Sequence, residues 1–264
     1  MSRPASRNDR LTNGMSTDFV KLYAQTTTWG NLVSMARMLP QLRCAWVMSS
    51  LDENGLLYDI SGQGRSLTPA GGAASPTYGN YGVIPYADFA LGSSQYLSRA
   101  DEAGLDITGS LTVISWVRFD ALSTGANTGL ISKWYAAGGA TQASYRLSKT
   151  VTDQLQFSIT TDGSTVVSIN DAAANYAAAT WFYLVGRYSV VQKLLEICVN
   201  NTWYQLAVGV PASIHIGTEP LRVASSNRGN YLDGQMAFGA ICADSVSNTI
   251  CRAFYEHTRG AFGV

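Results

Sequence analysis

Apolar and polar residues alternate in short runs along most of this chain, and turn residues separate the runs. Residues 110–119 (SLTVISWVRF) give the clearest case: alternation divides them between two faces, with Leu111, Val113, Ser115 and Val117 on one and Thr112, Ile114, Trp116 and Arg118 on the other. A two-residue repeat of this kind predicts a β-strand. Similar runs cover residues 42–50, 129–134, 144–149, 154–160, 165–170, 180–190, 193–201, 203–208, 221–226 and 234–243.

Tight turns join many of these runs, and no helical pattern lies between them. The segment 161–164 (TDGS) contains Asp-Gly, which is the strongest short signal for a hairpin. Regular short strands with tight turns indicate an antiparallel β-sandwich or jelly roll. We therefore predict an all-β body over residues 42–264.

Helical spacing appears only near the two ends. Residues 19–25 (FVKLYAQ) follow possible capping residues at 16–18, and residues 29–39 repeat apolar side chains at helical spacing before Pro40, which disfavours a helix. Residues 245–260 predict a final helix capped by Ser247, with one face formed by Ile250, Ala253, Phe254 and His257. Residues 1–41 are thus expected to form a partly helical arm that packs either on the body or on a partner subunit.

The composition supports a strand-rich globular protein. Of its 264 residues 46% are hydrophobic and only 14% are charged, with 18 basic and 18 acidic residues. Long helices use charged residues on their exposed faces, so a low charged fraction favours strands. A net charge of zero argues against nucleic acid as a partner, because binding phosphates requires a basic surface.

The charge is nevertheless uneven, since residues 1–50 contain six basic and two acidic residues. Two interpretations remain open for this basic segment: an ordinary solvated tail, or a docking arm for an acidic partner. No apolar run reaches the roughly 18 residues of a membrane span, and the first residues have no hydrophobic core of the signal-peptide type. We expect a protein made and kept on the cytoplasmic side, or exported by another route.

Four cysteines, Cys44, Cys198, Cys242 and Cys251, lack CxxC spacing and lie in apolar surroundings. Buried free thiols are the favoured interpretation, with disulfides or metal ligands as the alternatives.

Several segments in order carry a family resemblance. They are AWVMSSLDENGLLYDISGQGRSLT, then DFALGSSQYLSRADEAGLDITGSLTVISWVRFDAL, then TWFYLVGRYS, and finally YLDGQMAFGAICADSVSNTICRAFYEHTRG. Over residues 44–260 this order resembles a laminin-G-like domain of the concanavalin A-like lectin/glucanase superfamily. It departs from the usual pattern at Ala90-Leu91, where Phe-x-Gly is one residue longer.

The resemblance implies a jelly roll of two curved antiparallel sheets, whose concave face commonly binds sugar. Some relatives bind structural calcium, some bind carbohydrate or protein, and a subset are glycoside hydrolases. Similar domains are attached to bacteriophage virion proteins. Fold alone does not decide among these functions.

Catalysis is not expected from these residues. Glycoside hydrolysis requires two carboxylates about 5–10 Å apart, and the hydrolases of this superfamily place them on one strand as E-x-D-x-E, which is absent here. The strand-like acids are Asp120 and Glu196, which stand far apart in the sequence. His215 and His257 are interpreted as strand, packing or surface residues, and two histidines are too few for a His/Cys metal site.

A calcium site is the more plausible chemistry. Calcium accepts many backbone oxygens, so one or two acids and a turn suffice. The resemblance implies Asp59 and Asp233 as ligands, with Asp52 or Glu53 nearby. The alternative is that Asp59 caps its own turn by accepting backbone N–H groups.

Aromatic residues at strand ends or in loops are the candidates for contact with a sugar or a protein partner. These residues are Trp134, Tyr135, Trp203, Tyr204 and Tyr231. In contrast, Trp46, Trp116 and Trp181 stand inside predicted strands and are expected in the core.

The sequence thus favours a non-enzymatic structural or adhesive protein of a virion, such as a phage decoration, fibre or tail component. Its arm (residues 1–41) is expected to bind other virion or assembly proteins, with a cell-surface glycan as a further partner and a homo-oligomer as one possible assembly. The alternatives are a carbohydrate-binding module, with or without calcium, and a divergent glycoside hydrolase.

Overall fold

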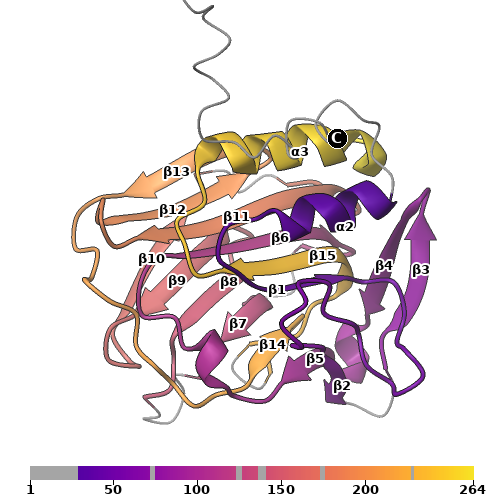
Figure 1. Ribbon diagram of the computed structural model, residues 1–264, viewed down its shortest axis with the longest axis horizontal. Helices are drawn as coiled ribbons and strands as arrows, with labels where there is room; N and C mark the ends of the chain where they lie inside the picture. The colour runs from indigo at the N-terminus through magenta and orange to yellow at the C-terminus, as the bar shows by residue number, and fades with distance from the viewer. Residues whose placement is uncertain (1–28, 72–74, 123–126, 136–140, 173–175, 227–228) are drawn as a thin grey trace, which may run out of the picture.

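A computed structural model describes residues 29–71, 75–122, 127–135, 141–172, 176–226 and 229–264. These residues form two antiparallel sheets packed face to face, with two α-helices on one side (Figure 1). The predicted all-β sandwich with a short C-terminal helix is therefore confirmed. No described helix combines the length and apolar character needed to cross a membrane.

The sheet nearer the helices has eight strands in the order β13-β12-β11-β6-β15-β4-β3, with β1 also paired to β15. Its strands are β1 (Leu42–Val47), β3 (Thr77–Tyr81), β4 (Ile84–Phe89), β6 (Leu111–Phe119), β11 (Trp181–Ser189), β12 (Leu194–Val199), β13 (Thr202–Leu206) and β15 (Gly234–Cys242).

The other sheet has seven strands in the order β10-β9-β8-β7-β14-β5-β2. Its strands are β2 (Thr68–Gly71), β5 (Gln95–Arg99), β7 (Thr128–Lys133), β8 (Tyr145–Lys149), β9 (Leu155–Thr160), β10 (Val166–Asn170) and β14 (Leu221–Val223). Two 3₁₀ turns, η1 (Leu91–Ser93) and η2 (Ala103–Leu105), lie on either side of β5 in the chain.

The molecule has two apolar layers, and β6 belongs to both. Val113 and Val117 point into the core between the sheets, whereas Ile114 and Trp116 lie under the helices. The predicted division of residues 110–119 between two faces is confirmed. Both faces are buried because helices cover the outer face of the eight-stranded sheet.

Helix α3 (Asn248–Phe262) covers much of that outer face. The Ser247 side chain accepts a hydrogen bond from the Ile250 N–H at its start, and Gly263 ends it in the left-handed conformation (φ 72°). The indole Nε1 of Trp116 donates to the Thr258 hydroxyl at 3.1 Å, which fixes the helix to β6. Both the predicted helix and its cap are confirmed.

Helix α2 (Trp29–Arg37) also packs on the body, although the sequence assigned it to the arm. Leu32, Met35 and Ala36 are fully buried in the layer between the helices and the sheet. Arg37 donates through Nε to the Ile60 carbonyl at 2.7 Å. The predicted helix at 19–25 lies outside the described residues.

Strands β2 to β5 were not among the predicted runs. Thr68–Gly71 forms a sheet edge and contains Pro69, which an edge strand tolerates because proline has no N–H to donate to a neighbouring strand. Strand β3 (Thr77–Tyr81) is also polar. It forms an edge of the eight-stranded sheet and pairs only with β4. Edge strands with one exposed side carry little hydrophobic alternation, so their pairing depends on the tertiary fold.

The four cysteine side chains are buried free thiols, as predicted. Burial raises the pKa of both Cys198 and Cys251 to about 12, so these thiols stay protonated at neutral pH. Trp46, Trp116 and Trp181 are buried as predicted, the first between the sheets and the other two beneath the helices.

Candidate functional site

A row of polar side chains crosses four strands on the outer face of the eight-stranded sheet. The strand register places Thr112, Arg187, Glu196 and Gln205 side by side on β6, β11, β12 and β13. The neighbouring row lies two residues away along each of the four strands. It is apolar and ends at Trp203 on β13. Helix α3 covers the apolar row but does not extend over the polar one.

The α3 cleft forms where that cover ends. Its main hollow has a volume of about 590 Å³ and is lined by Arg187, Glu196, Gln205 and the residues that lead into α3. A second hollow of about 300 Å³ adjoins it through Asn248 and is lined by Asn201, Trp203, Thr249 and Arg252. Together these two hollows have the size of ordinary small-ligand sites.

The floor of the α3 cleft is a buried ion pair. Arg187 Nε lies 2.7 Å from Glu196 Oε2, and each residue is only 5% exposed. A second guanidinium nitrogen of Arg187, Nη1, donates to the Val246 carbonyl at 2.7 Å. The guanidinium also stacks over the Trp203 ring, with its carbon 4.2 Å from the ring centroid. These contacts fix the position of the Arg187 guanidinium, neutralise its charge and hold the Trp203 ring against it.

Most reachable groups of the cleft are amides and hydroxyls, and apart from the buried pair its lining also includes one acid, Asp244, and one base, Arg252. Gln192, Gln205 and Asn248 are exposed at its wall, and Ser245 is partly exposed. Amides and hydroxyls both donate and accept hydrogen bonds. Beside a half-buried indole and above a neutral ion pair, they suit a ligand with many hydroxyl groups and no net charge.

Of the five aromatic candidates, Trp203 alone lines the α3 cleft. Tyr204 points the other way and packs against the core between the sheets, because neighbouring strand residues face opposite sides. Tyr204 therefore faces away from the α3 cleft, and its role as a contact residue stays a prediction.

The other three aromatic candidates lie elsewhere. Trp134 is 2% exposed beneath Arg146, and Tyr135 follows the end of β7. Tyr231 stacks on Tyr96 of β5 with ring centroids 6.0 Å apart. The structure does not bring these residues together with Trp203.

Asp59 is a turn cap, which was the alternative interpretation of this residue. It is 1% exposed, and its two oxygens accept hydrogen bonds from the backbone N–H groups of Ala45, Ser61 and Arg65 and from the Ser61 hydroxyl, at 2.8 to 3.0 Å. These bonds hold the turn 58–68 against β1.

Asp59 and Asp233 lie too far apart to coordinate one calcium ion together. Asp59 bonds Ala45, which pairs with Ala240, whereas Asp233 precedes Gly234 at the start of β15. Six strand positions span about 20 Å. Among the described residues, no three His, Cys, Asp or Glu side chains gather closely enough to hold a metal.

Replacing Asp59 with alanine is expected to lower the free energy of unfolding by at least about 2 kcal/mol, because buried N–H groups lose their acceptor. Urea denaturation measures this change. EDTA is expected to leave the melting temperature of the intact protein unchanged, and a drop with EDTA that the Asp59→Ala variant lacks would restore the calcium interpretation.

The remaining titratable candidates are engaged structurally. His215 Nε2 lies 3.0 Å from the Thr141 carbonyl, and His257 is a buried residue of α3 with 8% exposure. Asp120 is half exposed and lies 3.4 Å from Arg118 at the end of β6.

Sequence reasoning treated Glu196 as an isolated acid and missed Arg187. The sequence did contain a signal for this pair. Arg187 is the only charged residue of the predicted strand 180–190, and Glu196 is the only one inside the predicted strand 193–201, whose first residue is Lys193. The short turn between the strands makes them a hairpin, and hairpin pairing sets the two charges opposite each other.

A family model described as the concanavalin A-like lectin/glucanases superfamily matches residues 91–248. The match ends at the first residue of α3, so of the cleft lining only Thr249 and Arg252 lie outside it. No curated protein matches the chain.

Solved structures share the fold at low sequence identity. The binding domain of Paraclostridial Mosquitocidal Protein 1 is 10% identical, with a TM-score of 0.62, over 83% of this chain and 52% of that one. The ligand-binding domain of botulinum neurotoxin serotype D, in complex with N-acetylneuraminic acid, is 11% identical, with a TM-score of 0.60, over 85% and 52%. This chain thus spans about half the length of these toxin domains.

Domain 4 of AbnA, a GH43 extracellular arabinanase from Geobacillus stearothermophilus, in complex with arabinotriose, is 12% identical, with a TM-score of 0.59. That likeness covers 82% of this chain and 99% of the arabinanase domain.

Proposed function

Because this chain belongs to the concanavalin A-like lectin/glucanases superfamily, we propose that it is a lectin-like binding protein without enzymatic activity and that a neutral carbohydrate occupies the α3 cleft. The observation that carries the proposal is the stack of Trp203 on the neutralised Arg187–Glu196 pair at the floor of an amide-lined hollow.

The comparisons support sugar binding as a use of this fold. The botulinum neurotoxin domain is in complex with N-acetylneuraminic acid, and the arabinanase domain is in complex with arabinotriose. At such low identity these likenesses concern the fold, so the position of the site rests on the residues of this chain.

The chemistry of the α3 cleft favours a neutral ligand. Glu196 already compensates the charge of Arg187, so an ionic group gains no unpaired partner at the floor. An indole packs against the apolar C–H face of a sugar ring, while amides such as Gln205 and Asn248 bond its hydroxyls.

The test is a glycan array probed with the intact protein, followed by calorimetry on the best ligand. Replacing Trp203 with alanine is expected to weaken binding by about ten-fold or more, equivalent to about 1.4 kcal/mol. Gln205→Ala is expected to weaken it several-fold.

The matched control is Tyr58→Ala, which removes an aromatic side chain that is 58% exposed in the turn 58–68. It should bind as the intact protein does. An array with no neutral glycan bound, or unchanged affinity in Trp203→Ala, contradicts the site, and release of shortened sugars contradicts the non-enzymatic assignment.

We further propose that the sandwich is an adhesive component of a virion or similar particle, attached through residues 1–28. The support is the excess of basic residues at this end of the chain and the docking of α2 on the body through Leu32, Met35 and Ala36. The proposed anchor is therefore shorter than the arm expected from the sequence.

A variant lacking residues 1–28 is expected to fold and keep glycan affinity but to be lost from its assembly, as measured by co-purification. Removal of residues 1–41 should also destabilise the fold, because Leu32, Met35 and Ala36 leave the apolar layer. Equal incorporation of the 1–28 deletion and the intact chain would refute the anchor.

A further inference from the structure

A second polar row crosses the outer face of the seven-stranded sheet, on the opposite side of the sandwich from the α3 cleft. The register joins one residue from every strand of this sheet into it: Ser168, Ser158, Arg146, Ser132, Arg222, Ser98 and Thr68. Residues that alternate with them, such as Leu147 and Phe157, fill the core between the sheets. The row therefore lies on the outer face of the sheet, where Ser132, Ser158 and Arg222 are buried and Arg146 and Ser168 are partly exposed.

Arg146 is the exceptional member of this row. Its guanidinium carbon lies 4.5 Å from the centroid of the Trp134 ring, and Nη2 donates to Gln156 Oε1 at 3.0 Å. The Nε hydrogen is buried without an acceptor, and no carboxylate among the described residues pairs with the group. Burial lowers the pKa of Arg146 to about 10, which leaves it charged at neutral pH.

Other buried cations of the same sheet each have an acidic partner. Arg222 lies 2.8 Å from Glu219, Lys149 lies 2.7 Å from Asp153, and Lys133 contacts two aspartates. A charge removed from water is costly unless it is paired. Arg146 therefore offers one uncompensated positive charge, held in place by stacking on Trp134.

The groups around Arg146 are hydroxyls and amides. Ser158 Oγ lies 2.9 Å from Ser168 Oγ and also donates to Gln156 Oε1, and the Gln156 amide donates to Asn170 Oδ1 at 2.8 Å. Such groups match the hydroxyls of a sugar and form no apolar pocket for a peptide side chain. A single guanidinium matches a single negative charge.

We propose that Arg146 is the anion subsite of a second carbohydrate site, which takes a sugar bearing one carboxylate or sulfate ester. The guanidinium would donate to an oxygen of the anion, and Ser168 and Asn170, both partly exposed, would bond the sugar hydroxyls. This site differs from the α3 cleft in position and in the charge of its ligand.

The test is calorimetry on the full chain with three matched monosaccharide probes: the methyl glycoside of galacturonic acid, its methyl ester, and the methyl glycoside of galactose 6-sulfate. At least one anionic probe is expected to bind about ten-fold or more tightly than the methyl ester, and more weakly as salt rises from about 50 to 200 mM. The two anionic arms show whether carboxylate or sulfate is preferred.

Arg146→Gln is expected to lose at least about ten-fold in affinity for that probe, and Arg146→Lys several-fold, because lysine keeps the charge without the planar fork. The control Arg259→Gln removes an arginine on α3, far from this face, and should bind normally. If Arg146→Gln does not fold, Arg146→Lys carries the test alone.

Three results would overturn the site: equal binding of the acid and its methyl ester, no binding of either anionic probe, or unchanged affinity in the Arg146 variants. Trp203→Ala separates the two proposals, because it should weaken binding of the neutral glycan by about ten-fold or more and leave binding of the anionic probe intact.

Discussion

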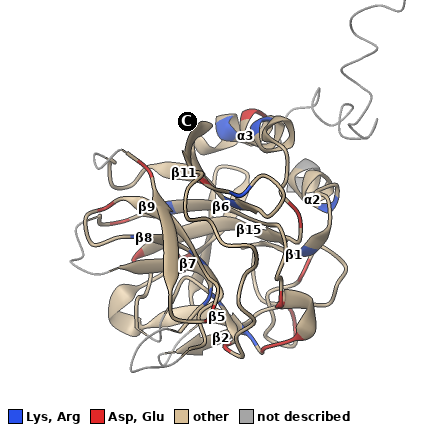
Figure 2. Ribbon diagram, turned by 90° about the vertical axis from the view of Figure 1, so that its left-hand side faces the viewer, with Lys and Arg blue, Asp and Glu red and all other residues tan. Residues whose placement is uncertain are grey.

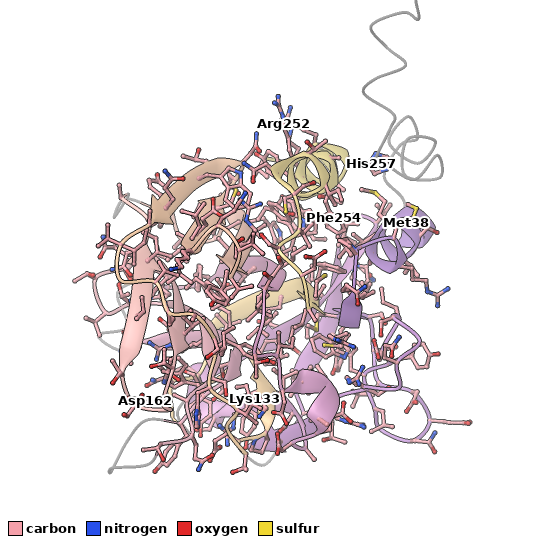
Figure 3. The ribbon with its side chains drawn as sticks, turned by 60° about the vertical axis from the view of Figure 1, so that its left-hand side comes forward. Met38, Lys133, Asp162, Arg252, Phe254 and His257 are labelled. Carbon is pink, nitrogen blue, oxygen red and sulfur yellow. The ribbon has the colours of Figure 1, made fainter. Side chains whose placement is uncertain are left out.

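Replacing Lys133 with methionine is expected to lower the free energy of unfolding by about 3–5 kcal/mol, because two carboxylates lose their buried counter-charge. Lys133 stands at the end of β7 and is fully buried (labelled in Figure 3). Its ammonium lies 2.7 Å from Asp101 and 2.8 Å from Asp106, and it also donates to the Gly217 carbonyl. One side chain thus ties two distant loops to the seven-stranded sheet.

Urea denaturation at neutral pH measures this effect. The matched control is Lys193→Met, which alters an exposed lysine and should change stability by less than about 0.5 kcal/mol. Adding Asp106→Asn to Lys133→Met should recover part of the loss, because one uncompensated charge is removed. A loss below about 1 kcal/mol in Lys133→Met would show that the two aspartates are well solvated without it.

Replacing Phe254 with alanine is expected to cost about 3–5 kcal/mol and to abolish glycan binding in the α3 cleft. Phe254 is fully buried on the sheet side of α3, whereas Arg252 points away from the body (Figure 3). Its ring lies 5.1 Å from Phe238 and 6.0 Å from Tyr183, centroid to centroid. The cavity left by alanine would loosen the helix that forms one wall of the cleft.

Three measurements check this prediction: urea denaturation, calorimetry with the glycan, and hydrogen exchange of the α3 amides, which should become faster. Arg259→Ala on the exposed side of the same helix is the control. It removes one surface ion pair with Glu256 and should cost less than about 1 kcal/mol. Full glycan affinity in folded Phe254→Ala would show that α3 does not shape the site.

This sandwich has few charged residues, and residues of both signs are spread along its strands, loops and helices (Figure 2). It is therefore informative to ask, for each buried ion pair, whether local pairing or the tertiary fold brings the two charges together. Arg187 with Glu196 and Lys133 with Asp106 are separated by 9 and 27 residues in the chain. The first pair follows from one hairpin, but the second depends on how a loop returns to the sheet.

The sequence by itself determined the strands whose residues alternate, the final helix with its Ser247 cap, and the sandwich as a whole. These features depend on local periodicity and on the chemistry of turns, which each segment carries in its own residues. It left Asp59 open between a turn cap and a metal ligand, because both uses need the same acid in the same turn.

Only the tertiary structure decided that α2 and α3 both cover the outer face of the eight-stranded sheet. It also separated Trp203 from Tyr204 and from Trp134, placed Arg187 beneath Trp203, and gave Arg146 no carboxylate partner within the part of the chain that the structure describes. The physical reason is that strand register and the packing of layers join residues distant in the chain. A local pattern records which way a side chain points but not what it meets there.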